Sequence, residues 1–289
     1  MDDVDGLLEE MSCWLSKGEE SLSWGVHLRP HMLRLMTHLG LFFRRIGRGS
    51  CDDLISSILE SYVQQLVHLS RTDLAAVYVS QIPLPQDQVR LYAQCLVLVE
   101  QQSQSCDDSE RSHLLSLAQQ VGLDVNAIAK QVVLTLCSQE DVQHVGDTSL
   151  QVRFINSLQI LQQFNLTCEE MIVIYTCEIH FHLCLKIATT GEDERRIRSL
   201  KWLLIDPSMR SELLAQANTL MRGYLLRRQI EAVKLTYQLI PADSIALLSD
   251  QWESRTGLRE LPPDVESSIR EYLCVKTYLD ALDSFQVRS

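Results

Sequence analysis

The sequence contains few residues that interrupt helices: seven prolines and eleven glycines among 289 residues. Most of them fall where an apolar pattern of helical spacing starts or stops. Nine cysteines occur singly along the chain, with no CxxC pair. This scatter excludes a regular disulfide framework and points to a reducing compartment, the cytosol or the nucleus.

Positive charge is in short supply, because 26 Lys and Arg residues face 38 Asp and Glu residues, for a formal net charge of −12. Such a balance repels a polyanion, and we therefore expect no direct binding of nucleic acid. The cations Arg44, Arg45 and Arg48 gather at the end of one predicted helix. Complementing the helix dipole explains them better than an anion site does.

No uninterrupted apolar run is long enough to span a membrane. The most apolar stretch, 171–188, contains Glu178, His180, His182 and Lys186, each of which is costly at membrane depth. The acidic start, MDDVDGLLEEM, lacks the positively charged and the apolar regions of a signal peptide. We predict neither a transmembrane segment nor a signal peptide.

The common catalytic and nucleotide-binding motifs are missing: GxGxxG, GxxxxGK[ST], HExxH and GxSxG do not occur. Ser50, Cys106 and Cys137 are potential nucleophiles, but none belongs to a motif that carries a base. The acidic pairs Asp52–Asp53 and Asp107–Asp108 precede predicted helices, where capping explains them better than acid–base catalysis. We therefore predict no enzymatic activity and no cofactor.

What the sequence does contain is helical periodicity along most of its length. Apolar residues recur every three or four positions in about ten segments joined by short connections, with no strand pattern outside 152–188. Gly122-Leu123-Asp124 combines a helix end with a helix start, which is typical of an antiparallel helix pair. We predict an all-α fold, an irregular α-solenoid of stacked antiparallel helices without a strict repeat.

Local signals also predict individual helices. Thr72-Asp73 indicates an N-cap for a short helix over 74–81, and Asp206-Pro207 opens another helix. The segment over residues 27–47 carries apolar residues on most of its circumference, including Phe42 and Ile46, which predicts a helix packed between neighbours. The last helix places the following apolar residues on one side: Val265, Ile269, Tyr272, Leu273, Leu279 and Leu282.

One short stretch, CEIHFHLC over 177–184, has the composition of a metal site. Cys177, His180, His182 and Cys184 are potential zinc ligands, and either a strand or a helix brings three of them to one face. The second ligand pair that closes a zinc finger is missing, so burial or an insert explains the stretch better. Trp202, Trp252 and Tyr272 are candidate interface anchors, although their helical spacing favours the core.

Several long segments are similar to consecutive parts of one family, the 107-kilodalton nucleoporin of the Y-shaped outer-ring complex of the nuclear pore. They are DVDGLLEEMSCWLSKGEESL (3–22), HMLRLMTHLGLFFRRIG (31–47), RTDLAAVYVSQIP (71–83), VGLDVNAIAKQVV (121–133), residues 201–245 and SIREYLCVKTYLDALDSF (268–285). The resemblance implies a coat-like helical scaffold that supports pore assembly and the transport of mRNA and protein, located at the nuclear envelope. The implied partners are other scaffold nucleoporins.

The resemblance also implies a domain organisation. Residues 1–150 are expected to form a trunk-like helical solenoid and 191–289 the truncated start of a C-terminal helical domain. Most of the region that binds the 133-kilodalton nucleoporin would then be absent. Segment 151–190 matches nothing in the family pattern, and we interpret it as an atypical insert, either disordered or produced by a gene-model error.

The sequence also allows two alternative functions. One is a metal-binding protein that uses CEIHFHLC, and the other is a cytosolic vesicle-coat adaptor that shares the solenoid fold.

Overall fold

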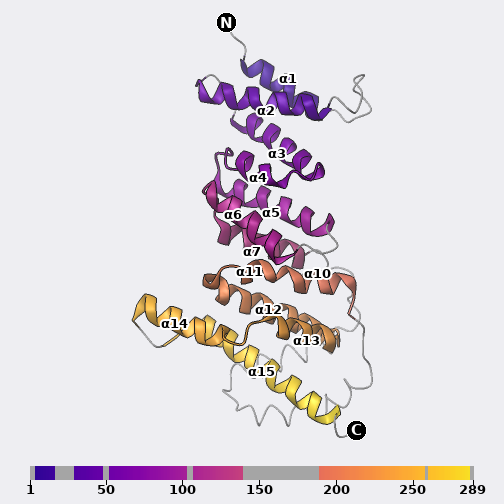
Figure 1. Cartoon of the computed structure of the whole chain (residues 1–289), viewed down its shortest axis with the longest axis vertical. Helices are drawn as coiled ribbons and strands as arrows, with labels where there is room; N and C mark the ends of the chain where they lie inside the picture. Colours follow the sequence, from indigo (N-terminus) through magenta and orange to yellow (C-terminus); the bar gives the residue numbers. More distant parts are fainter. Residues whose placement is uncertain are drawn as a thin grey trace. The chain divides into compact units, whose positions relative to one another are not determined.

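The computed structural model describes residues 4–16, 29–47, 52–102, 107–138, 189–257 and 260–286 (Figure 1). Within these ranges every regular element is a helix, which confirms the predicted all-α class. The chain divides into two compact units, Met1–Val132 and Val133–Ser289. Of the predicted insert, 151–190, only Thr189 and Thr190 belong to the described residues. The three-part organisation therefore stays a prediction.

The first unit is a stack of helices that follow one another in chain order, with neighbours side by side (Figure 1). Helix α3 contacts α1, α2, α4 and α5. The helices are α1 (Val4–Ser16), α2 (Arg29–Arg45), α3 (Asp52–His68), α4 (Thr72–Val79), α5 (Pro85–Gln102), α6 (Asp108–Gln120) and α7 (Val125–Ser138), of which α7 continues past the unit boundary.

The core of this unit follows the predicted apolar stripes. Ile55, Ile58, Leu59 and Val63 of α3 are fully buried, at the three- and four-residue steps that keep side chains on one helix face. Burying each such side chain contributes about 1.5–3 kcal/mol of hydrophobic free energy. Helices α4 and α5 add further buried residues to this core: Ala75, Ala76, Val79, Leu91, Tyr92 and Leu96.

The second unit is built around α12 (Arg210–Leu226), which contacts α11, α13, α14 and α15. Trp202, Leu213, Met221 and Tyr224 are at most 1% exposed and form much of its core. The other elements are α10 (Gly191–Ser199), α11 (Lys201–Leu204), the 3₁₀ helix η2 (Pro207–Met209), α13 (Ile230–Leu239), α14 (Ser244–Thr256) and α15 (Pro263–Gln286).

Two predicted helix junctions are confirmed in detail. Gly122 has a φ of +83°, a left-handed conformation that glycine adopts without a steric cost. Asp124 then accepts a hydrogen bond from the Ala127 backbone N–H at 3.0 Å and caps α7. Asp206 accepts from the Ser208 backbone N–H at 2.8 Å, and Pro207 starts a 3₁₀ turn that leads into α12.

The predicted N-cap at Thr72-Asp73 is wrong. Helix α4 already includes Thr72, and its N-cap is Arg71, which makes no capping hydrogen bond through its side chain. The Arg71 guanidinium instead pairs with the Asp73 carboxylate at 3.2 Å. Asp73 therefore complements the helix dipole from within the first turn rather than capping the helix.

One prediction of packing is wrong. Phe42 of α2 and Ile46, the residue directly after α2, are 55% and 48% exposed, although this helix was predicted to be packed on most of its circumference. Among the apolar residues that were placed on one side of α15, Ile269, Tyr272, Leu279 and Leu282 are buried, whereas Leu273 is 41% exposed. At these positions helical spacing identified apolar side chains, but neighbouring helices do not cover them.

Candidate interaction surfaces

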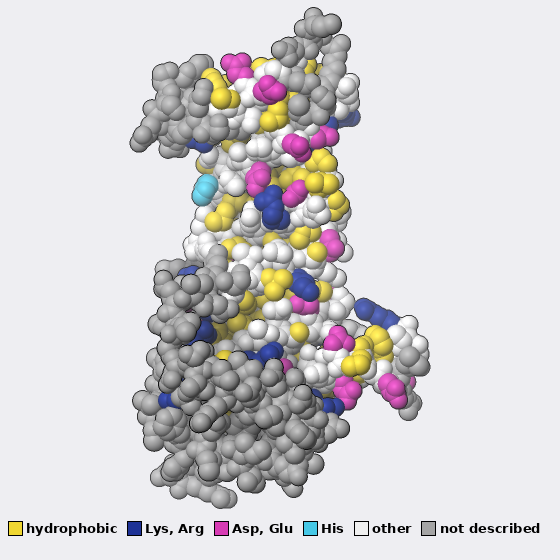
Figure 2. Space-filling model, turned by 180° about the vertical axis from the view of Figure 1, so that it is seen from behind, with side chains coloured by type: hydrophobic (Ala, Val, Ile, Leu, Met, Phe, Trp, Pro, Cys, Tyr) yellow, Lys and Arg dark blue, Asp and Glu magenta, His cyan; other side chains and the backbone are white. Residues whose placement is uncertain are grey.

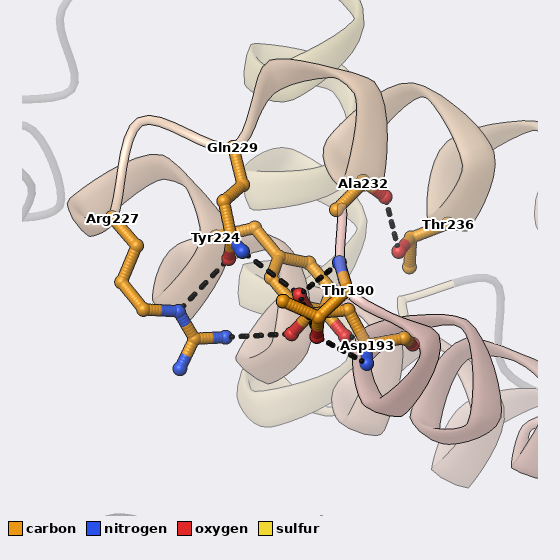
Figure 3. A network of polar contacts seen from close by, with 7 residues as sticks. All are labelled: Thr190, Asp193, Tyr224, Arg227, Gln229, Ala232 and Thr236. Carbon is orange, nitrogen blue, oxygen red and sulfur yellow. Dashed lines mark hydrogen bonds and ion pairs between the residues drawn. The ribbon is translucent and has the colours of Figure 1, made fainter. Parts of the chain in front are cut away.

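The start of α10 holds a polar network centred on Asp193 (Figure 3). The Thr190 backbone N–H and hydroxyl donate to Asp193 Oδ2 at 2.9 and 2.7 Å. In return, the Asp193 backbone N–H donates to Thr190 Oγ1 at 3.1 Å, which completes a capping box with aspartate in the third helical position. Sequence reasoning missed this capping box, although the T-x-x-D spacing at the start of a helix is the signal that would have found it.

The same carboxylate joins α10 to the turn between α12 and α13. The Gln229 side-chain amide donates to Asp193 Oδ2 at 2.8 Å, and Arg227 Nη2 lies 3.6 Å from Oδ1. The buried Tyr224 hydroxyl donates to the Asp193 carbonyl at 3.2 Å (Figure 3). These contacts fix three segments to one another, so the network serves the fold rather than a reaction.

Burial alone would raise the pKa of the Asp193 carboxyl. The hydrogen bonds from Thr190, the charge of Arg227 and the hydrogen bond from Gln229 outweigh burial and hold the pKa below its ordinary value. Burial raises the pKa of the Tyr224 hydroxyl, so both side chains keep a fixed protonation state near neutral pH. Neither residue is poised for proton transfer at that pH.

A buried ion pair joins α5 to α6 in the first unit. Arg111 Nη2 lies 2.7 Å from Glu100 Oε1, and both side chains are 2% exposed. Asp108 contributes a second carboxylate, 2.9 Å from Arg111 Nη1. Asp107, one residue earlier, caps α6 by accepting from the Glu110 backbone N–H at 2.6 Å, which confirms the capping interpretation of the Asp107–Asp108 pair.

The arginines at the end of α2 do not all point into solvent. Arg44 Nε lies 2.9 Å from Asp52 Oδ1 at the start of α3, and Nη1 donates to the carbonyl of Gln81. Arg44 therefore links α2 to α3 and to the segment after α4. Arg45 is exposed, and Arg48 lies outside the described residues.

Of the three candidate anchor residues, two belong to the core. Trp202 is 1% and Tyr272 is 6% exposed, and the Tyr272 ring stacks on Tyr237 with 4.8 Å between the ring centroids. Trp252 of α14 is half-buried. The preference for core packing is therefore confirmed for Trp202 and Tyr272.

The candidate zinc ligands Cys177, His180, His182 and Cys184 lie outside the described residues, as do Ser50 and Cys106. Within the described part of the chain, no three His, Cys, Asp or Glu residues gather closely enough to hold a metal ion. The zinc hypothesis stays a prediction. Cys137 lies half-buried in α7.

On the molecular surface, the described hydrophobic side chains lie among charged side chains of both signs on the face that Figure 2 shows. Several large apolar side chains are more than one-third exposed; Leu35 and Phe42 belong to α2, and Ile46 follows it directly. None of the helices in the described ranges has the length and apolar character to cross a bilayer. Exposed apolar side chains on helix faces are candidate contact points for other proteins.

Comparison with known proteins gives a consistent result. The family model for nuclear pore protein 84 / 107 matches residues 1–287. The chain is 35% identical to the nuclear pore complex protein Nup107 of Rattus norvegicus over 289 residues, which are 99% of this chain and 26% of the relative. Identity to the Homo sapiens Nup107 is 34% over 286 residues, 98% of this chain and 26% of that protein.

A more distant relative shows the same relationship: the nucleoporin nup107 of Schizosaccharomyces pombe is 26% identical over 222 residues, 76% of this chain and 22% of the relative. The chain spans about a quarter of the length of the mammalian relatives that it matches. Because the family model extends over almost all of its residues, the chain belongs to the nuclear pore protein 84 / 107 family.

Proposed function

We propose that this chain is part of a structural scaffold of the nuclear pore complex. The observation that carries the proposal is the match of the family model to residues 1–287, over helices that stack within each unit. In this role the chain supports pore assembly, and through it the transport of mRNA and protein, by presenting helix faces to other nucleoporins. It acts at the nuclear envelope and catalyses no reaction.

The proposed partners are other scaffold nucleoporins of the Y-shaped outer-ring complex. The polar networks support such a role, because buried Asp193 and the Glu100–Arg111 pair hold helices in fixed positions. A scaffold needs this rigidity to present its outer faces reproducibly. The alternatives of a zinc protein and a vesicle-coat adaptor receive no support from the relatives.

Imaging tests this function directly. A fluorescent tag placed on the protein at its own gene should give a continuous nuclear rim that coincides with a pore marker. Fluorescence in cytoplasmic vesicles without a rim would contradict the proposal and favour the coat adaptor. Co-elution of the purified protein with recombinant outer-ring nucleoporins in size-exclusion chromatography provides the biochemical counterpart.

A further inference from the structure

Helix α2 has two apolar faces. Leu33, Met36, Thr37 and Gly40 are buried, and this face packs against α3. A second set lies at positions i, i+4, i+7 and i+11. Its last member, Ile46, directly follows Arg45 at the end of α2, and its backbone N–H still donates to the Phe42 carbonyl at 3.1 Å, so the set lines another face of the helix. We call this set the α2 stripe; it consists of Leu35, Leu39, Phe42 and Ile46.

The α2 stripe faces outward. Leu35, Phe42 and Ile46 are 52%, 55% and 48% exposed, and Leu39 is partly buried. Single exposed apolar residues are normal on protein surfaces. Four in register over three turns, a span of roughly 17 Å at 1.5 Å per residue, instead match the anchor spacing by which one helix binds another.

The charge on α2 is opposite to that of the chain. The helix contains no acidic residue, whereas the chain as a whole has a net charge of −12. At 100° per residue, its exposed basic residues fall along one edge of the α2 stripe. They are His31, Arg34, His38 and Arg45. The opposite edge holds the partly buried Met32 and Phe43.

We propose that the α2 stripe binds an amphipathic helix of another protein, one that carries acidic residues along the edge facing Arg34 and Arg45. This deepens the proposed function and rests on it, since a scaffold nucleoporin acts through helix faces presented to partners. Apolar contact along the stripe supplies affinity. The one-sided basic edge selects the orientation and charge of the partner helix.

A second copy of this chain fits the α2 stripe poorly. In a two-fold symmetric dimer with parallel α2 helices, the basic edge of each copy would face the other edge of its partner helix, which holds Met32 and Phe43 and offers no opposite charge. With antiparallel α2 helices, the same edge of each helix comes together. Arg34 and Arg45 of one copy would then face basic residues of the other, which repels them. The acidic residues of a helix from another protein would instead be attracted to this basic edge.

Designed peptides test the proposal on the purified full chain. One 18-residue helical peptide carries Leu at i, i+4, i+7 and i+11 and Glu along one edge, and its twin carries Lys in place of Glu. Fluorescence anisotropy should show binding of the Glu peptide, with a Kd at least about tenfold lower than that of the Lys peptide. Added salt should weaken binding of the Glu peptide.

Variants locate the binding site. Phe42→Ser combined with Ile46→Ser should raise the Kd of the Glu peptide by at least about tenfold. Leu69→Ser is the matched control, because Leu69 is 54% exposed but lies just after α3 and outside the stripe. Arg34→Glu with Arg45→Glu should reverse the preference toward the Lys peptide. Circular dichroism confirms that each variant is folded.

Each of the following results would overturn the proposal: equal binding of both peptides, an equal loss with Leu69→Ser, a dimer of the chain that Phe42→Ser with Ile46→Ser abolishes, or sedimentation with anionic lipid vesicles that the same variant abolishes. The dimer would indicate a second copy and the vesicles a membrane surface. A protein that reaches the nuclear rim but binds neither peptide would overturn this proposal alone. Loss of rim localisation in the unaltered protein would instead overturn the proposed function.

Discussion

At the scale of single residues, Asp193 is where charge and hydrogen bonding are most closely linked. Oδ2 accepts from two groups of Thr190 and from Gln229, while Arg227 lies near Oδ1. Asp193→Asn replaces an acceptor by an amide that has donors of its own. Because buried donors then lose their partner, the free energy of unfolding should fall by about 1–3 kcal/mol, measured by urea denaturation.

Asp73→Asn is the control for this substitution. Asp73 also pairs with an arginine, but that pair is exposed and water screens it, so stability should stay nearly unchanged. Equal losses in the two variants would show that burial of Asp193 is not what matters.

The pKa of Asp193 gives the same network a pH signature. Its folded pKa lies below the ordinary value, so its contribution to stability is fully present above the unfolded pKa of about 3.9. That contribution is lost as pH falls through the folded pKa. At pH 5, about one unit above the unfolded pKa, the carboxyl is ionised in both states. The difference in unfolding free energy between the native protein and Asp193→Asn should therefore be constant from about pH 5 to 7 and shrink below about pH 4. A difference that does not shrink in acid would contradict this account.

The Glu100–Arg111 pair illustrates a second property of buried charge. Arg111→Met leaves Glu100 buried without its closest cation, and the expected loss of stability is about 3–5 kcal/mol. Adding Glu100→Leu to Arg111→Met removes the stranded charge and should recover most of that loss. Chemical denaturation of the single and double variants measures the coupling. A double variant that is less stable than Arg111→Met would refute the argument.

At the scale of helices, replacement of two glycines by alanine should change the stability of the protein in opposite directions. Gly122 has a φ of +83° at the junction of α6 and α7, so a Cβ there is strained although no atom lies within 4 Å. Gly122→Ala should therefore destabilise the protein by about 1 kcal/mol. Gly223 lies within α12, also with open space around a Cβ, and Gly223→Ala should stabilise by about 0.5–1 kcal/mol. Thermal unfolding measures both, and changes of equal sign would contradict the conformational explanation.

Helices are also where the sequence was most informative. Periodicity and local capping depend on residues within a few positions of one another, which is why Gly122-Leu123-Asp124 and Asp206-Pro207 were placed correctly. Spacing says which residues share a face but not whether another helix covers it, so Phe42 and Ile46 were wrongly expected to be packed. The Asp193 network was missed because Gln229, 36 positions away, joins it only through the fold.

At the scale of the whole molecule, each of the two units has buried residues of its own, and cooperativity should follow that division. Arg111→Met removes stability from the first unit. If the units open separately, the backbone amides of α3, α5 and α6 should lose protection against hydrogen exchange by at least roughly 100-fold. That factor corresponds to the loss of about 3 kcal/mol of stability. Helices α12 and α13 of the second unit should keep their protection.

Asp193→Asn provides the reciprocal experiment, because it should lower protection in α10, α12 and α13 and leave α3 and α5 unchanged. Exchange measured by mass spectrometry, peptide by peptide, distinguishes the two patterns in one sample. If either variant instead lowers protection equally in both units, the chain unfolds as a single cooperative body. A scaffold segment of that kind would transmit strain along its length, whereas two separately stable units confine a local defect to the unit in which it occurs.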